Sequence, residues 1–273
     1  MEILVCVKRV PTVGGAITLT ADGRSVDTRM SGFTISPHEE CAVEEAVRLV
    51  ERFGGSVTVV TLGPVAAEEQ LRSCLALGAS AAILLELASG VEAGPVATAA
   101  ALFSVAQFSV AQSAVARSSV AQQSVAADGG FDLVLLGNEA SDTGDYQVGI
   151  RLAHLLGRPV ATGIKSLSVA DSGESVVASR TYRGALETFS LPLPCVVTVK
   201  EGINLPRYPS LPGRLRAKRA AITRVPVSPE PEGLRMTSLC VPDAPRQQAT
   251  VLGHGVAAVP ALVTALSELG VIS

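Results

Sequence analysis

The chain has 273 residues, a formal net charge of −3 and an apolar content of 48%. These values fit one large globular domain, and they exclude a disordered chain or a strongly basic surface for nucleic acid. Aromatic residues make up only 3% and tryptophan is absent, so the core must consist of aliphatic side chains. That composition favours a buried parallel sheet covered by helices.

Strands and helices are expected to alternate as far as Gly157. The predicted strands are residues 2–7, 57–62, 82–87 and 132–136. The predicted helices are residues 37–53, 66–77, 95–127 and 146–156, and a short hairpin is expected over residues 16–28. The clearest boundary is Ser36, which Pro37 follows directly and Glu39 follows three residues later, as in a capping box. Such alternation predicts a doubly wound, mostly parallel α/β sheet.

The pattern changes after Gly157. Polar turns separate short strand signals at residues 164–169, 175–183 and 186–191, which predict a small antiparallel addition. A β-branched run at residues 195–199 is expected to return to the main sheet. From residue 201 prolines recur and apolar runs are few, so we expect an extended C-terminal arm with one helix near 259–269. The chain therefore divides into an α/β domain at 1–200 and a second segment at 201–273.

Residues 103–127 consist of five tandem pentapeptides, FSVAQ FSVAQ SAVAR SSVAQ QSVAA. A period of five rotates by about 140° per repeat around a helix, so the valines form no single apolar stripe. We interpret this segment as a low-complexity insertion that lengthens a surface helix or its adjoining loop. We expect it to be dispensable for function.

Several signatures of catalysis are absent from the sequence. It contains no Gly-Lys dipeptide for a phosphate-binding loop, no GxSxG and no HExxH. The five cysteines include no CxxC pair and the three histidines are scattered, so we expect no disulfide framework, no metal site and no catalytic residues. Buried reduced thiols, an N-terminus unlike a signal peptide and the lack of a long apolar segment favour a cytoplasmic location.

Residues 133–149 combine a predicted strand, a loop with glycines and the start of a helix. In open α/β sheets, the carboxyl end of a strand is where ligands bind. Gly137 and Gly144 would let the main chain approach a ligand, and the helix start would attract phosphate. Asp142 and Asp145 would oppose a phosphate unless they cap the helix or bind ribose. An ordinary strand–loop–helix connection is the alternative.

A second local feature is the basic segment at 207–219, RYPSLPGRLRAKR, which contains five basic and no acidic residues. Pro209 and Pro212 would stiffen an exposed loop with Leu211 at its tip, which makes an anchor for a partner. A solvated basic linker would have the same composition.

Six segments together resemble the β subunit of electron transfer flavoprotein. They are VKRV at 7–10; SP at 36–37 with CAVEEAVRL at 41–49; GP at 63–64 with LALGA at 75–79; DLVLLG at 132–137 with QVG at 147–149; LET at 186–188 with LPCVVT at 193–198; and NLPRY at 204–208 running to KR at 218–219. These segments cover most of residues 1–220 in the family's order.

The resemblance implies a three-layer α/β/α subunit, similar to adenine nucleotide alpha hydrolases, that pairs with an α subunit. The α subunit mainly holds the FAD, and this chain holds a structural AMP or, in an electron-bifurcating form, a second FAD. Electrons would pass from acyl-CoA dehydrogenase-like flavoenzymes to a quinone reductase in fatty acid oxidation, so the chain would be an electron carrier and not an enzyme. A non-redox, stress-type nucleotide-binding module is the alternative from another class.

The resemblance also implies site residues. The nucleotide contacts would be Cys6, Ser36, Pro37, His38, Glu39, Leu62, Gly137, Asn138, Glu139, Ala140, Ser141, Asp142, Thr143, Gly144, Asp145, Tyr146, Gln147 and Val148. Partner recognition would use Arg207, Leu211, Arg214, Arg216, Lys218 and Arg219. Leu211 would be the anchor of this loop, and residues 221–273 would pack on the α subunit.

Overall fold

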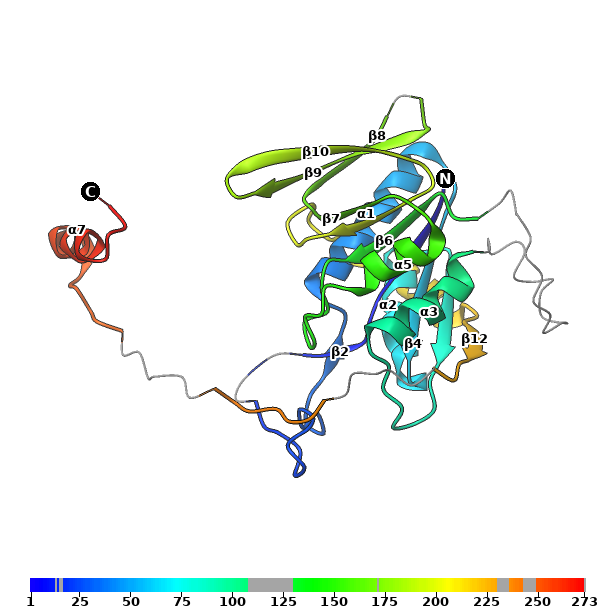
Figure 1. Cartoon of the computed structure of the whole chain (residues 1–273), viewed down its shortest axis with the longest axis horizontal. Coiled ribbons are helices and arrows are strands. Elements are labelled where there is room, and N and C mark those ends of the chain that lie inside the picture. Colours follow the sequence, from blue (N-terminus) through cyan, green and yellow to red (C-terminus); the bar gives the residue numbers. More distant parts are fainter. Residues whose placement is uncertain are drawn as a thin grey trace, which may run out of the picture. The chain divides into compact units, whose positions relative to one another are not determined.

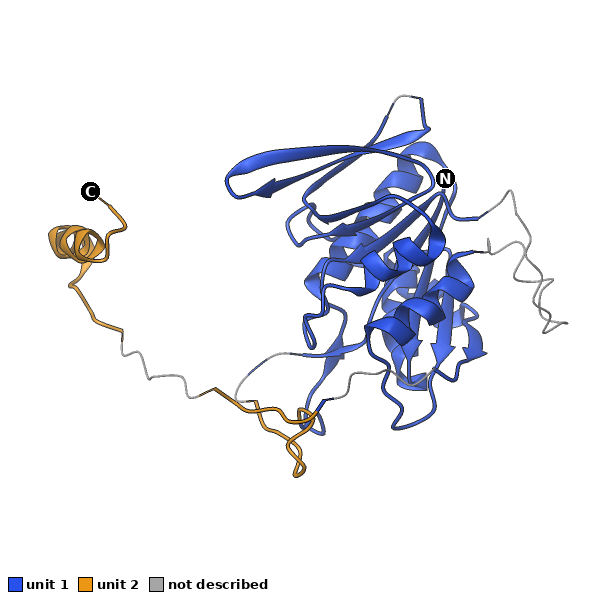
Figure 2. Cartoon of the chain, viewed as in Figure 1, with its two compact units in different colours: residues 1–16, 27–236 blue, residues 17–26, 237–273 orange. Residues whose placement is uncertain are grey.

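A computed structural model describes residues 1–12, 14, 17–107, 130–170, 172–229, 236–242 and 249–272 (Figure 1). The chain forms two compact units, residues 1–16 with 27–236 and residues 17–26 with 237–273 (Figure 2). The structure thus differs from the division that the prolines suggested at residue 200, because the larger unit extends to residue 236.

A seven-stranded sheet in the order β12-β5-β4-β1-β6-β11-β7 forms the centre of the larger unit. Its strands are β1 (Glu2–Cys6), β4 (Ser56–Gly63), β5 (Ala81–Glu86), β6 (Leu133–Gly137), β7 (Val160–Ile164), β11 (Cys195–Val199) and β12 (Thr223–Pro226). Neighbouring strands pair in parallel, as predicted, and β11 returns to the sheet as expected. The central strand β1 lies between β4 and β6.

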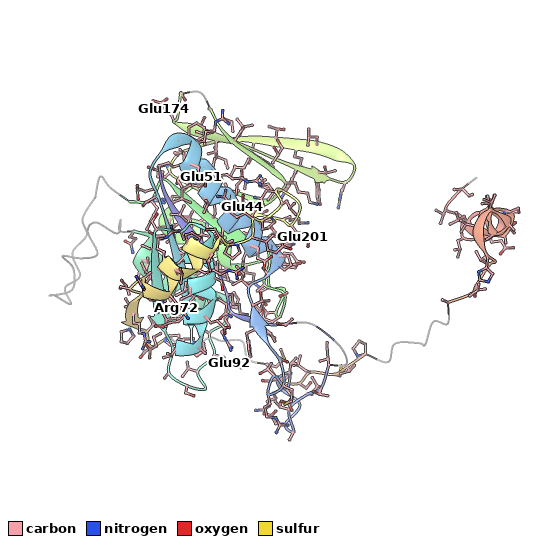
Figure 3. The ribbon with its side chains drawn as sticks, turned by 180° about the vertical axis from the view of Figure 1, so that it is seen from behind. Glu44, Glu51, Arg72, Glu92, Glu174 and Glu201 are labelled. Carbon is pink, nitrogen blue, oxygen red and sulfur yellow. The ribbon has the colours of Figure 1, made fainter. Side chains whose placement is uncertain are left out.

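Helices cover both faces of this sheet, which confirms the predicted three-layer fold. They are α1 (Pro37–Phe53), α2 (Glu68–Leu77) after the turn η1 (Val65–Ala67), α3 (Pro95–Ala106), α5 (Val148–Leu156) and α6 (Leu211–Arg219). Alternation along β1 serves both faces, because Ile3 and Val5 pack in the core with α1 and α2 while Leu4 and Cys6 pack in the core with α3 and α5. Figure 3 shows Glu44 and Glu51 on α1, seen from behind.

The start of α1 confirms the capping box read from the sequence. The Glu39 amide donates to Ser36 Oγ at 3.3 Å, and the Ser36 amide donates to Glu39 Oε2 at 3.0 Å. Helix α5 starts two residues later than predicted, because Tyr146 has a φ of 58°, which an α-helix does not permit. Helix α3 ends at Ala106. Residues 108–127 of the pentapeptide segment lie outside the described residues.

The predicted antiparallel addition is confirmed as the sheet β10-β9-β8, formed by β8 (Ser166–Val169), β9 (Ser175–Tyr182) and β10 (Ala185–Pro192). The single strand predicted at 164–169 is in fact split, since Ile164 ends β7 of the main sheet and β8 begins at Ser166. Strands β2 (Val10–Pro11) and β3 (Phe33–Thr34) form a separate pair. The hairpin expected over residues 16–28 is reduced to one bridge between Leu19 and Val26.

The prediction of an extended arm from residue 201 was wrong for residues 211–226. Helix α6 packs on α2 so closely that a Cβ on Gly213 would lie 2.5 Å from the carbonyl oxygen of Ala76. Strand β12 then pairs with β5 at the edge of the main sheet. Its sequence, TRVP, is too short and too polar to give a strand signal. In the smaller unit, η3 (Gly255–Ala258) and α7 (Val259–Glu268) agree with the predicted terminal helix.

None of the helices in the described ranges has both the length and the apolar character needed to cross a membrane.

Candidate functional site

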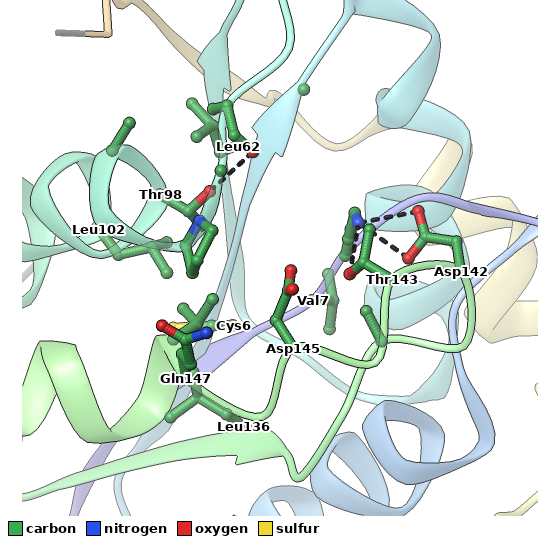
Figure 4. Close-up of a pocket in the computed structure, with 18 of the residues that line it drawn as sticks. Cys6, Val7, Leu62, Thr98, Leu102, Leu136, Asp142, Thr143, Asp145 and Gln147 are labelled. Atoms are coloured by element: carbon green, nitrogen blue, oxygen red, sulfur yellow. Dashed lines mark hydrogen bonds and ion pairs between the residues drawn. The ribbon is translucent and has the colours of Figure 1, made fainter. Parts of the chain in front are cut away.

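A pocket of about 770 Å³ opens in the larger unit at the carboxyl ends of β1, β4 and β6 (Figure 4). Strand β1 pairs with β4 on one side and with β6 on the other. The connections that follow β4 and β6 therefore run towards opposite edges of the sheet. Open α/β sheets bind ligands at such a switch point, and the volume lies within the range of small-molecule sites. The residue pattern alone had pointed to the end of β6, and the resemblance added Cys6 at the end of β1 and Leu62 near the end of β4.

Most residues predicted to contact a nucleotide line this pocket. They are Cys6, Glu39, Leu62, Gly137, Asn138, Glu139, Ala140, Asp142, Thr143, Asp145, Tyr146, Gln147 and Val148. The residues Ser36, Pro37, His38, Ser141 and Gly144 are not part of the lining. Ser36 still reaches the loop, since its Oγ donates to the carbonyl oxygen of Glu139 at 3.2 Å. Contact of these residues with a nucleotide stays a prediction.

Sequence reasoning missed a second group of lining residues, most of which lie at the end of β1, at the end of β4, after β5 and in the first turns of α3, with others in β6, in α5 and after β12. They are Val7, Lys8, Arg9, Gly63, Pro64, Leu87, Val91, Glu92, Ala93, Gly94, Pro95, Ala97, Thr98, Leu102, Leu136, Gly149, Pro229 and Met236. The dipeptide Gly94-Pro95 is a recognisable helix start, but the sequence does not show that this start meets the end of β1.

Glu39 joins the end of β1 to the start of α1. Its Oε1 accepts from the Lys8 amide at 3.0 Å, and its Oε2 accepts from the Ser36 amide. Burial raises the pKa of this carboxyl to about 8, although the two hydrogen bonds and the Lys8 charge act in the opposite direction. A Cβ on Gly137 would lie 2.7 Å from Glu39 Cγ, so only glycine lets β6 end against this carboxyl.

Cys6 forms part of the pocket wall and is buried. Burial, and secondarily the charge of Glu39, raise the pKa of its thiol, which therefore stays protonated at neutral pH. The expectation of buried thiols is confirmed for Cys6, Cys41, Cys74 and Cys195. It was wrong for Cys240, which is exposed.

The loop between β6 and α5 closes one side of the pocket. Asp142, expected to cap a helix or bind ribose, instead accepts from Lys8 Nζ at 2.8 Å, and Thr143 Oγ1 lies 3.5 Å from the same nitrogen (Figure 4). Asn138 fixes the start of the loop, because its Oδ1 accepts from Thr198 Oγ1 at 2.8 Å. A Cβ on Gly149 would lie 2.5 Å from Thr198 Cγ2, so glycine is required where α5 passes β11.

Two kinds of group in the pocket lining favour an anion. Helices α3 and α5 both begin at the lining, and neither Gly94 nor Gln147 caps its helix with a side chain. Helix N-termini without a cap favour anions. Lys8 and Arg9 add two cationic side chains.

Of Lys8 and Arg9, Arg9 has fewer polar interaction partners among the described residues. In the described part of the chain no carboxylate lies within ion-pair distance of its guanidinium, its buried Nε has no hydrogen-bond acceptor, and its guanidinium carbon stacks 3.2 Å from the centre of the Phe33 ring. The lining also contains carboxylates with no described hydrogen-bond partner, those of Glu92, Glu139 and Asp145. Cations and helix starts suit a phosphate and free carboxylates suit hydroxyl groups, so this set of groups fits a nucleotide.

No group of three or more His, Cys, Asp or Glu residues within the described ranges is arranged to hold a metal ion.

The predicted recognition segment lies away from the pocket lining, and it is a helix start and not a loop. Ser210 caps α6, since its Oγ accepts from the Gly213 amide at 3.1 Å, and Leu211 is the first residue of α6 and 70% exposed. The described residues offer no ion-pair partner to the exposed side chains of Arg214, Arg216, Lys218 and Arg219. Arg207 differs, because Glu44 and Glu51 bind its guanidinium.

Comparison with known proteins identifies relatives of this chain. The model of the electron transfer flavoprotein domain family matches residues 25–230. Among the curated relatives are proteins named electron transfer flavoprotein subunit beta from Bacillus subtilis, Bradyrhizobium diazoefficiens and Homo sapiens. The Bacillus subtilis protein is 37% identical over 68% of this chain and 64% of its own length, so this match spans less than two thirds of that relative. The Bradyrhizobium diazoefficiens protein is 35% identical over 84% and 82%, and the Homo sapiens protein is 33% identical over 99% and 98%.

Proposed function

Because the chain belongs to the family of electron transfer flavoprotein β subunits, we propose that it pairs with a flavin-carrying α subunit and that the heterodimer carries electrons between other redox enzymes. The donors are acyl-CoA dehydrogenase-like flavoenzymes of fatty acid oxidation, and the acceptor is a quinone reductase. The FAD, held mainly by the α subunit, supplies the redox chemistry when bound. This chain contributes no acid–base step, and its role is to bind and to position.

The ligand of this chain is AMP, bound in the pocket at the switch point. The observation that carries this proposal is the convergence of the predicted segments on one cavity that also contains two cations and two uncapped helix starts. Lys8 and Arg9 balance the phosphate charge, and the main chain of the loop from Gly137 to Val148 encloses the nucleotide. Glu92 and Asp145 are available to accept from ribose hydroxyls.

Two buried groups of the pocket lining, the Cys6 thiol and the Glu39 carboxyl, support an anionic ligand because they are mostly uncharged at neutral pH. At pH 7 the Cys6 thiol is protonated, and the pKa of about 8 keeps most of the Glu39 carboxyls protonated too. Ionised Glu39 would repel a phosphate in this low-dielectric site. The groups closest to the ends of β1 and α1 therefore add no negative charge.

Docking on the donor uses the start of α6. Leu211 is an exposed apolar side chain, and the free cations Arg214, Arg216, Lys218 and Arg219 follow it on the same helix. An acidic partner surface with an apolar pocket fits this arrangement, with the cations acting chiefly on the rate of association. Residues 237–272 are proposed to pack on the α subunit, since α7 exposes Leu262 and Val263.

The test is to co-express the chain with its α subunit, record the visible spectrum of the purified complex and quantify the nucleotides released by denaturation. We expect a yellow heterodimer with one FAD and one AMP. Two FAD molecules and no AMP would identify the electron-bifurcating form with a flavin in this pocket. A colourless chain that forms no heterodimer would contradict the proposal and favour a non-redox nucleotide-binding module.

A further inference from the structure

The segment that leads into α6 is attached to α1 by side chains spaced along one side of that helix. Asn204 Nδ2 donates to Glu45 Oε2 at 2.9 Å. Arg207 Nε donates to Glu44 Oε2 at 2.9 Å, and its Nη1 and Nη2 donate to the two oxygens of Glu51 at 2.6 and 2.9 Å. We call Glu44, Glu51 and Arg207 the α1 clamp; Figure 3 labels both of its carboxylates.

Glu44 is the buried centre of the α1 clamp, with 2% of its side chain exposed. It also accepts from the Arg207 amide at 3.1 Å and from Arg48 Nε at 2.6 Å. Burial alone would raise the pKa of Glu44, but the hydrogen bonds from Arg207 and Arg48 hold it below its ordinary value, so the clamp is charged at neutral pH. Apolar side chains of similar volume often stabilise a buried site equally well, so stability alone does not explain an ion pair here. We interpret its role as fixing the position of the segment that contains Arg207.

The other end of the segment is fixed as well. Arg72 Nη1, on α2, donates to the carbonyl oxygens of Ala217 at 2.7 Å and Ala220 at 3.2 Å, which closes the C-terminal end of α6. Gly213 packs closely against the carbonyl oxygen of Ala76 on α2. The segment from residue 204 to residue 220 is therefore attached to α1 near its start and to α2 near its end, and Leu211 lies between these attachments.

The anchored segment exposes large apolar side chains between its attachment points. Leu205 is 83% exposed, Tyr208 is 94% exposed and Leu211 is 70% exposed. Exposed apolar residues on a mobile loop would lose much conformational entropy on binding. Because the segment is attached to α1 and α2, most of this conformational entropy is lost when the chain folds and not when the partner binds.

We propose that Arg207 is a positioning residue, which the α1 clamp uses to hold Leu211 in the orientation that a donor flavoprotein binds. This inference rests on the docking role proposed for Leu211. Sequence reasoning placed Arg207 among the partner contacts, whereas in this proposal both carboxylates occupy its guanidinium and it acts through the leucine. Binding then depends on Arg207 without an interaction between Arg207 and the partner.

The test uses the purified heterodimer as electron acceptor and an acyl-CoA dehydrogenase, reduced by its acyl-CoA substrate, as donor. Glu51→Ala removes the exposed half of the clamp, and Arg207→Lys keeps the charge but loses the paired hydrogen bonds. We expect each variant to raise the KM for the donor about three- to tenfold, the range that lost pre-organisation implies. The kcat and the flavin spectrum should be unchanged, and hydrogen exchange at residues 205–210 should be faster.

Two further variants make the result specific. Arg224→Ala breaks a matched exposed pair, Arg224 with Glu68 at 2.5 Å, and should leave the KM unchanged. Leu211→Ala reports on docking itself. When Leu211→Ala is combined with Glu51→Ala, the joint increase in KM should be smaller than the product of the two separate increases. The reason is that a leucine already displaced by Glu51→Ala contributes less to binding, so its removal has a smaller effect.

Different failures have different meanings. If Leu211→Ala leaves the KM unchanged, the proposed docking role is wrong and the inference falls with it. If Leu211→Ala raises the KM but Glu51→Ala does not, docking stands and the positioning role is overturned. An effect of Arg207→Lys without one of Glu51→Ala would show that Arg207 touches the partner directly.

Discussion

The pocket and the α1 clamp are both charged sites within the same unit, and they differ in how fully the charges are matched. In the clamp each carboxylate lies within 3.0 Å of an arginine nitrogen, and Glu44 binds two arginines. In the pocket, Arg9 has no carboxylate within reach among the described residues, and two helix starts have no side-chain cap. Matched polar groups specify a structure, whereas unmatched ones at a cavity remain available to a ligand.

The sharpest way to break this comparison is Glu44→Ala. The change leaves Arg207 and Arg48 without their buried partner, so we expect the free energy of unfolding to fall by about 2–4 kcal/mol. The exposed partner Glu51 provides the matched control, since Glu51→Ala should cost at most about 1 kcal/mol. Urea unfolding of both variants, followed by circular dichroism, measures the difference. Equal costs would mean that the burial of Glu44 has no energetic importance.

Glu39 gives the pocket a dependence on pH of the opposite sign to that of the clamp, because the pKa of Glu39 is raised and those of Glu44 and Glu51 are lowered. Between its ordinary pKa of 4.5 and the folded value of about 8, the folded chain holds a proton that the unfolded chain has released. Stability from this group is therefore complete below pH 4.5 and decreases as the pH rises towards 8. The loss between pH 5 and pH 8 should be on the order of 3 kcal/mol.

The variant Glu39→Gln cannot titrate, so the free energy of unfolding should vary less with pH in this range than in the wild type. Urea titrations at pH 5, 6.5 and 8 compare the two slopes. A variant with the slope of the wild type would assign the pH dependence to another group.

The smallest effect is expected for Lys8, and it concerns the binding of AMP and not the stability of the fold. If Lys8 balances the phosphate, Lys8→Met should weaken AMP binding about tenfold and leave adenosine binding unchanged. Lys200 follows β11 at the same edge of the sheet but does not line the pocket, so Lys200→Met is the matched control. Calorimetry on the heterodimer freed of its nucleotide measures all four affinities. Equal losses for AMP and adenosine would show that Lys8 shapes the pocket and does not bind the phosphate.

The parts of the fold that the sequence predicted are those with local signals. Ser36, Pro37 and Glu39 define the start of α1 by spacing alone, and β-branched runs define the buried strands. Strand β12 gave no such signal, because four residues with an arginine and a proline form a strand only where β5 offers an open edge. Tyr146 and its left-handed backbone also depend on the surrounding loop, so the start of α5 was misplaced.

The strand–loop–helix pattern at residues 133–149 pointed to the loop from Gly137 to Val148, and the resemblance added Cys6, Leu62 and the stretch from Ser36 to Glu39. Lys8 and Arg9 follow β1, but their role at the cavity is visible only when the start of α3 lies beside them. The clamp was missed for another reason. Glu44 is a charged residue and would ordinarily be expected at the surface, yet its side chain is buried. A buried glutamate cannot be recognised until Arg207, far along the chain, is seen to bind it.

The place of β1 in the sheet has a consequence for synthesis on the ribosome. This strand is made first, yet Glu2 pairs with Ser56 and Ile3 pairs with Leu133, so its second neighbour arrives only when β6 has emerged. Such distant pairings slow folding and leave one edge of β1 open in the nascent chain. The pocket lies between these same strands, so the proposed nucleotide would have nothing to bind before that moment. A ligand that binds there would stabilise only the assembled sheet and would thereby favour chains that have closed correctly over incomplete ones.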